Sequence, residues 1–221
     1  MYGFQYQTGL VQTPIEQDYP YFLLEPAANY PISLVEARVH LKIDADDAYS
    51  NTYIDFIIKA ATSFAEKYTG LDFIQKKYLT FRDSFSYPMT LRRGPFSLQE
   101  NSIVFKYILN GVWTAVPTTS YQIQYLKPYA KILATRGGNF NYSTDDVAQA
   151  IRIEFIAGFG ATKDSVPDDL RLGLLNHIAA IYENRGDADE GTSGFASTNF
   201  AETLPIQTKN IYNSYKIIET H

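Results

Sequence analysis

The hydrophobic period changes twice along the chain, and this change constrains the fold more than any other feature of the sequence. Over residues 54–68, apolar side chains recur three and four positions apart, as on one face of an α-helix. Residues 78–156 instead fall into short β-branched and aromatic runs, which are typical of strands. A helical spacing returns after Pro167. We therefore expect an α+β fold, a small bundle of three main helices with an inserted antiparallel β region.

The helix ends carry recognisable signals. Ser33 and Glu36 fit a capping box, in which each side chain binds a free amide at the helix start. Asp46 or Asp47 is the expected N-cap of the second helix, and Gly70 the residue that ends it. Within a core spanning residues 32–185, the helices are expected over residues 33–43, 47–69 and 167–185.

The β region is expected over residues 76–156. Asn110-Gly111 lies between two strand-like runs and predicts a type I′ hairpin turn, which needs two residues with positive φ. Gly158-Phe159-Gly160 follows the last run and predicts a glycine-hinged corner leading to the next helix. The predicted strands cover residues 78–85, 103–109, 112–116, 120–126, 131–134 and 150–156.

Three segments flank or interrupt this body. Residues 1–31 hold seven aromatics and four prolines with no helical or strand period, which predicts an extended N-terminal arm. Residues 186–203 are acidic and rich in small residues, as in a flexible linker. Residues 204–221 become apolar again, so we expect a C-terminal docking segment whose deletion leaves the rest folded.

Composition narrows the class of protein. The 221 residues include 18 tyrosines, 14 phenylalanines and one tryptophan, and only 19% are charged. Such a chain has enough apolar surface to fold, which excludes a disordered protein. The absence of cysteine excludes disulfides and thiolate chemistry. No run approaches the roughly 18 apolar residues of a membrane helix, and we expect no secretory signal in the first ten residues.

Charge is segregated along the chain. The net charge is −5, yet residues 76–136 contain nine basic residues and only two acidic ones. No lysine or arginine precedes Arg38, whereas four acidic residues do. This asymmetry predicts complementary contacts, either with nucleic acid or between copies of the chain.

No pattern predicts catalysis, a cofactor or a metal site, so we do not expect an enzyme. A calcium loop starting at Asp44 would need glycine at position 49, which is tyrosine. The three histidines lack metal-ligand spacing, and His177 is expected in the core. There is no Gly-x-Ser-x-Gly elbow and no complete dinucleotide or Walker motif.

The aromatic and basic β region leaves two alternatives open. Aromatics interleaved with bases can stack the bases of single-stranded nucleic acid, and an aromatic sheet can also bind or, with two carboxylates, hydrolyse carbohydrate. An ordinary sheet with aromatics pointing inward produces the same alternation, and we favour that interpretation.

Three stretches in order resemble the bacteriophage head–tail connector (adaptor) family. They are residues 32–44 with Asp46-Asp47, residues 60–70, and residues 157–185 with Ala157-Gly158-Phe159-Gly160-Ala161, Val166-Pro167-Asp168-Asp169-Leu170 and the run from His177 to Arg185. The resemblance frames residues 32–218.

The resemblance implies a structural virion protein without catalytic activity, located at the head–tail interface and assembled in the host cytoplasm. It implies a ring of twelve copies between the portal protein and a downstream neck, stopper or tail protein. Double-stranded DNA is expected to pass through the lumen of this ring. On this basis we expect portal docking by Leu204, Pro205, Ile206, Ile211, Tyr212 and Tyr215. Contacts from the arm to a neighbouring subunit are expected from Phe4, Tyr6, Tyr19, Tyr21 and Phe22.

Overall fold

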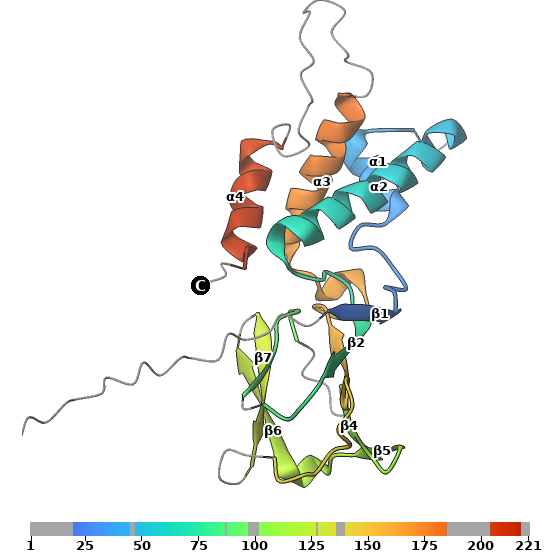
Figure 1. Ribbon diagram of the computed structural model, residues 1–221. Helices are drawn as coiled ribbons and strands as arrows, with labels where there is room; N and C mark the ends of the chain where they lie inside the picture. Colours follow the sequence, from blue (N-terminus) through green and yellow to red (C-terminus); the bar gives the residue numbers. More distant parts are fainter. Residues whose placement is uncertain are drawn as a thin grey trace, which may run out of the picture.

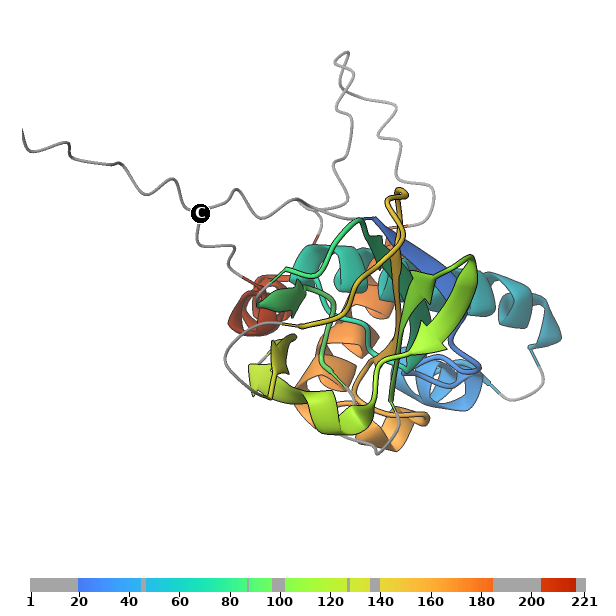
Figure 2. The ribbon, with the colours of Figure 1, turned by 60° about the horizontal axis from the view of Figure 1, so that its bottom comes forward.

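The computed structural model describes residues 20–44, 47–86, 88–96, 102–126, 128–135, 140–184 and 204–217. Its helices gather at one end of the molecule and its strands at the other (Figure 1). Viewed from the β end, the strands lie in front of the helices (Figure 2). The α+β class predicted from the sequence is confirmed.

The described helices are α1 (Leu34–Leu41), α2 (Ala48–Thr69), α3 (Asp168–Glu183) and α4 (Ile206–Tyr215). The capping box of α1 is formed, since the Ser33 amide donates to Glu36 Oε2 at 2.9 Å and the Glu36 amide donates to Ser33 Oγ at 3.3 Å. Asp47 caps α2, and Gly70 ends it with φ +77°. The described residues therefore contain one α-helix more than the three main ones expected.

The strands form two antiparallel sheets. The larger has the order β1-β2-β8-β4-β5, and the smaller has the order β3-β7-β6. Asn110 and Gly111 take φ values of 52° and 75° at the β4–β5 turn, which confirms the predicted hairpin. The bounds are β1 (Tyr21–Glu25), β2 (Lys76–Arg82), β3 (Met89–Leu91), β4 (Ile103–Leu109), β5 (Val112–Ala115), β6 (Tyr121–Leu126), β7 (Tyr129–Ala134) and β8 (Ile151–Ala157).

The molecule has two apolar cores. The helical core joins Ile54 and Ile57 of α2 with Leu174 of α3 and Tyr212 of α4, all fully buried. The β core lies between the two sheets and is largely aromatic. Its members include Tyr78, Phe96, Phe105, Ile132, Ile153 and Phe155.

The last part of the extended arm predicted over residues 1–31 is a strand of the large sheet. Residues 21–25 form β1, which pairs antiparallel with β2 from Tyr21↔Thr80 to Glu25↔Lys77. Pro20 and Pro26 flank this strand, and their missing amides are tolerated because β1 is an edge strand. The rest of the predicted arm, residues 1–19, lies outside the described residues, as does the predicted linker 186–203.

Candidate assembly surfaces

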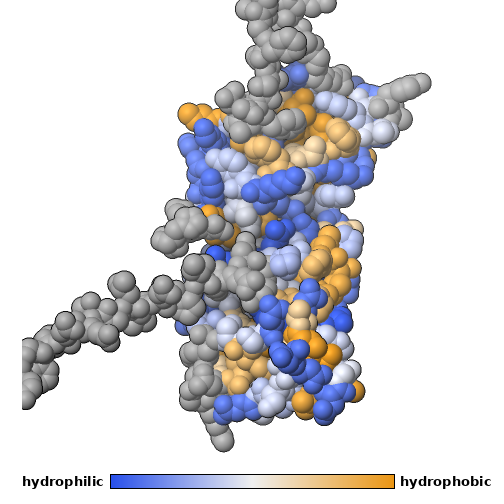
Figure 3. Space-filling model, in the orientation of Figure 1, coloured by the Kyte–Doolittle hydropathy of each residue, from blue (hydrophilic) through white to orange (hydrophobic). Residues whose placement is uncertain are grey.

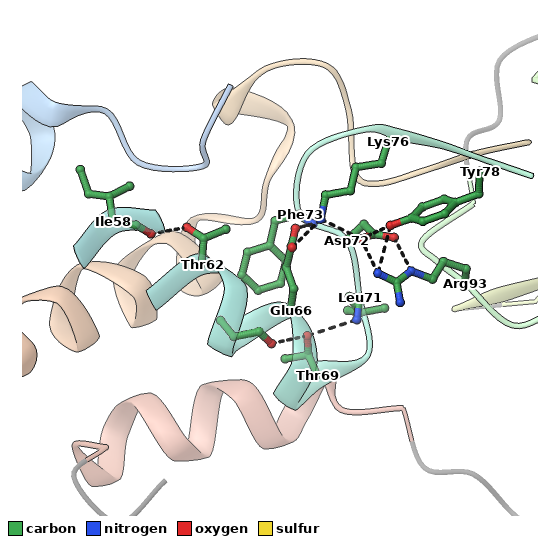
Figure 4. A network of polar contacts seen from close by, with 11 residues as sticks. Ile58, Thr62, Glu66, Thr69, Leu71, Asp72, Phe73, Lys76, Tyr78 and Arg93 are labelled. Atoms are coloured by element: carbon green, nitrogen blue, oxygen red, sulfur yellow. Dashed lines mark hydrogen bonds and ion pairs between the residues drawn. The ribbon is translucent and has the colours of Figure 1, made fainter. Parts of the chain in front are cut away.

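A buried carboxylate joins the helical end to the β end. Asp72 follows α2 and is fully buried, and its amide donates to the carbonyl of Gly94 at 2.8 Å. Its carboxylate accepts from Lys76 Nζ at 3.0 Å, from the Tyr78 hydroxyl at 2.9 Å and from Arg93 Nε at 2.9 Å (Figure 4). These donors come from β2 and from the loop after β3, so the Asp72 network fixes the orientation of α2 relative to the large sheet.

Glu66 extends this network into α2. Glu66 Oε1 accepts from the Phe73 amide at 3.0 Å, and Oε2 accepts from Lys76 Nζ at 2.5 Å. Burial raises the pKa of Glu66 in spite of the neighbouring ammonium. Burial and the Asp72 carboxylate both raise the pKa of Tyr78, which keeps its hydroxyl protonated as a donor. Lys76 thus lies between the carboxylates of Glu66 and Asp72. The network contains two acidic and two basic side chains, so its charges balance and its role is structural.

The predicted docking segment forms part of the helical core. Tyr212 and Leu204 are buried, and the ring of Tyr212 lies over Gly173 of α3, where an added Cβ would meet its Cε1 at 3.2 Å. The Tyr212 hydroxyl lies 3.4 Å from His177 Nδ1. Leu204 and Tyr212 are therefore not a free docking surface. Their burial argues against the expectation that residues 204–221 can be deleted without unfolding, which stays a prediction.

The other predicted docking residues lie nearer the surface of α4. Pro205 is the N-cap of the helix, and the Ile206 side chain is 75% exposed. Ile211 and Tyr215 are partly buried against the helical core, and the Tyr215 hydroxyl donates to Asp169 Oδ1 at 2.8 Å. The exposed side of α4, beginning at Ile206, is the part of this segment that a partner can reach.

Tyr21 and Phe22 of the predicted arm point to opposite faces of the large sheet. Tyr21 packs edge-on against Phe155 at 5.7 Å, and its hydroxyl accepts from the Arg92 amide at 2.9 Å. Tyr21 therefore belongs to the subunit's own β core, which corrects its assignment to an inter-subunit contact. Phe22 remains a candidate because it is 48% exposed. Phe4, Tyr6 and Tyr19 lie outside the described residues.

The face of the large sheet turned away from the β core carries exposed aromatics. The strand register places Phe22, Leu79, Glu154 and Val104 in one row across this face. The next row contains Phe81, Arg152, Lys106 and Ala115. Trp113 lies beside Ile108 on the same side and contacts the Phe81 ring at 6.4 Å. We call the surface formed by Phe22, Lys77, Leu79, Phe81, Val104, Lys106, Trp113, Arg152 and Glu154 the outer sheet face.

This outer sheet face is partly neutralised by its own ion pairs. Glu154 lies 3.2 Å from Lys77 Nζ and 2.7 Å from Arg152 Nη2. Burial alone would raise the pKa of Glu154, but the hydrogen bond from Lys77 and the Arg152 charge lower it. Lys106 has no ion-pair partner among the described residues. An apolar band is visible from β1 along the side of the β end (Figure 3).

The basic character of residues 76–136 is largely used within the chain. Lys76 and Arg93 bind Asp72, Lys77 binds Glu25 and Glu154, and the buried Arg82 guanidinium donates to the Thr90 carbonyl at 3.2 Å. The sequence count of nine bases therefore overstates the positive charge available to nucleic acid, because the acids Glu25, Asp72 and Glu154 that pair with these bases lie outside residues 76–136.

The remaining motifs have structural roles. Gly158 takes φ +131° at the corner after β8, as the glycine pattern predicted. The carboxylate of Asp145 accepts from the amides of Asn110 and Gly111, both at 2.8 Å, which stabilises the hairpin turn. In the described ranges no group of three or more His, Asp or Glu side chains could hold a metal ion. No helix among these residues is long and apolar enough to cross a membrane.

Comparison with known proteins identifies relatives by fold and not by sequence. No protein-family model matches the chain, and no curated protein matches it significantly. A chain in the neck of an empty GTA particle, computed with C6 symmetry, superposes with a TM-score of 0.66 at 18% identity, covering 91% of this chain and 97% of that one. A chain in the virion of a native gene transfer agent (GTA) particle gives a TM-score of 0.66 at 19% identity, with the same coverage of both chains.

A third structure, the neck of a native GTA particle computed with C12 symmetry, contains a chain with a TM-score of 0.61 at 21% identity, covering 90% of this chain and 97% of that one. At these identities the similarity establishes a shared fold over nearly the full length of both chains. It agrees with the connector resemblance found in the sequence.

Proposed function

We propose that this chain is a structural neck protein of a phage-like particle, an adaptor that forms a ring between the portal and the downstream neck or tail. The observation that carries this proposal is the shared fold with chains from GTA necks, at a TM-score of 0.66 and over 91% of this chain. The C6 and C12 symmetries of those necks favour a ring, and we expect twelve copies. Double-stranded DNA would pass through the lumen without sequence-specific binding.

The surface chemistry supports an assembly role. Neighbours in a closed ring meet through two different faces, so each subunit needs two complementary surfaces. The outer sheet face offers exposed aromatics of the kind enriched in protein interfaces. The helical end offers a second set of exposed apolar side chains, including Val35, Val39 and Phe56.

We place the portal contact on the exposed side of α4. Ile206 is the most exposed large apolar side chain of the described residues, and the remainder of α4 is held by the helical core. Ile206→Asp should therefore abolish portal binding while leaving the unfolding midpoint unchanged. Gln207→Asp, at an exposed position on the same helix, is the matched control for added negative charge, and equal loss in both variants would contradict a contact centred on Ile206.

Electron microscopy tests the proposed function as a whole. Negative-stain images of the full-length protein, alone and mixed with the portal protein of the same particle, should show rings with a central channel. A protein that stays monomeric even with portal present would overturn the proposal.

The two alternatives predict different behaviour. A single-strand-binding module would bind oligonucleotides with an affinity that falls steeply as salt rises, whereas a channel wall must let DNA slide. A carbohydrate-binding domain would give hits in a glycan screen, which the adaptor would not.

A further inference from the structure

The outer sheet face carries a series of aromatic side chains, two of them exposed, around the buried Leu79. Phe22, Phe81 and Trp113 come from three different strands and contact one another in series, at 6.2 Å and 6.4 Å between ring centroids. Phe22 and Trp113 are 48% and 38% exposed. A connected set of exposed aromatics is costly to leave in water and marks an interaction site.

The edge of the same sheet is also open. β1 is the last strand in the order β1-β2-β8-β4-β5, and its side chains Phe22, Leu23 and Leu24 are all exposed. Apolar edge strands associate with other chains unless they are covered. The aromatic face and the open edge meet at Phe22, so one extended segment can cover both.

The sequence of residues 1–19 complements this surface. It contains Tyr2, Phe4, Tyr6 and Tyr19, together with Glu16 and Asp18, and it has no lysine or arginine. The outer sheet face supplies Arg152 and the unpaired Lys106 between its aromatics. Acidic aromatic segments and basic aromatic surfaces attract each other through charge and buried ring area.

Length allows a neighbouring copy to own this segment. Nineteen extended residues reach about 60 Å, whereas a compact chain of this length has a radius of gyration of roughly 17 Å. The segment is therefore long enough to reach across the surface of an adjacent subunit.

We propose that residues 1–19 of one subunit lie across the outer sheet face of the next subunit, with aromatic side chains against Phe22, Phe81 and Trp113 and acids near Lys106 and Arg152. The inference rests on the proposed ring and adds the site at which neighbouring subunits are linked.

The chain has no cysteine and one tryptophan. An introduced cysteine and the fluorescence of Trp113 can therefore each report on this contact without background. Full-length Tyr6→Cys carrying an affinity tag is mixed with untagged full-length Lys106→Cys and treated with a bismaleimide, while native mass spectrometry follows ring formation. We expect a tagged–untagged covalent dimer. Ala161→Cys, at an exposed position between β8 and α3, replaces Lys106→Cys as the control and should give no such dimer.

Trp113 emission provides the second readout. On assembly it should shift to shorter wavelength, and Phe4→Ser/Tyr6→Ser should remove the shift and raise the ring-forming concentration about tenfold or more. Gln5→Ser/Gln7→Ser should behave as wild type.

Three results would overturn the inference. Rings that form without the Tyr6–Lys106 cross-link, or with equal cross-linking to position 161, would remove the arm contact and leave the proposed function intact. If oligothymidylate changes the Trp113 emission and assembly does not, the outer sheet face binds nucleic acid and not a neighbouring subunit. No assembly under any condition would remove the inference and the proposed function together.

Discussion

Asp72 provides the main buried polar contact between the helical end and the β end of the molecule. Its buried carboxylate accepts hydrogen bonds from Lys76, Tyr78 and Arg93, and two of these donors, Lys76 and Arg93, are cations that a neutral side chain would leave without a counter-charge. Removing one member of a buried charged network leaves the others unpaired, which costs far more than losing an exposed ion pair.

Asp72→Asn should therefore lower the free energy of unfolding by about 3–5 kcal/mol. The matched control is Asp55→Asn, which removes the 2.5 Å ion pair with Lys59 on the exposed face of α2 and should cost much less, because solvent screens an exposed pair. Denaturant unfolding of both variants measures the difference. Equal losses of unfolding free energy in the two variants would show that the Asp72 network does not hold the two ends of the molecule together.

His177 gives the helical core a defined pH dependence. Burial against Phe64 and the Tyr212 hydroxyl lowers the pKa of His177 from 6.5 to about 4. Because the unfolded chain binds this proton more readily, stability should fall as the pH drops from 6.5 towards 4. Glu36, whose pKa is lowered to about 2 by Lys163 and Ser33 against the effect of burial, loses its contribution only below about pH 4.5.

His177→Leu should flatten the stability profile between pH 6.5 and 4.5, a window in which Glu36 still contributes fully. Thermal unfolding at half-unit pH steps measures this. A slope that persists unchanged in the variant would assign the pH dependence to another group.

At the scale of elements, α4 is a part of the helical core and not a detachable appendage. Tyr212→Ala should cost about 3–5 kcal/mol, because it removes a fully buried aromatic side chain from the contact with α3. Ile206→Ala, on the exposed side of the same helix, should cost less than about 0.5 kcal/mol. Chemical denaturation distinguishes the two, and a small effect of Tyr212→Ala would restore α4 as a free docking segment.

The corner after β8 depends on glycine. At Gly158, with φ +131°, an added Cβ would lie 2.6 Å from the backbone N and Cα of Gln75, so Gly158→Ala must displace β2. Gly111 also has positive φ but nothing within 4 Å, so Gly111→Ala should cost only the roughly 1–2 kcal/mol of a left-handed residue. If Gly158→Ala were no more destabilising than Gly111→Ala in the same unfolding assay, the close approach at this corner would be wrong.

The sequence could predict the elements whose signals are local. The capping box of Ser33 and Glu36, the apolar face of α2 and the Asn110-Gly111 turn all depend on residues a few positions apart, and each is observed. β1 was missed because two prolines and the lack of alternation hide an edge strand. The place of Tyr212 and the partners of Asp72 were missed because both depend on residues brought together only by the tertiary fold.

At the scale of the whole molecule, two compact ends joined by one buried network present different surfaces to the outside. The β end carries the outer sheet face, and the helical end carries α4 with its exposed Ile206. Such a subunit can bind a neighbour through one end and a different protein through the other, which is what a ring between two components requires.

Native mass spectrometry of the full-length protein mixed with its portal tests this account most directly. We predict a complex that contains the portal and twelve copies of the 25.0 kDa chain. A chain that remains at the mass of one copy at every protein ratio, with the portal ring intact beside it, would contradict the account.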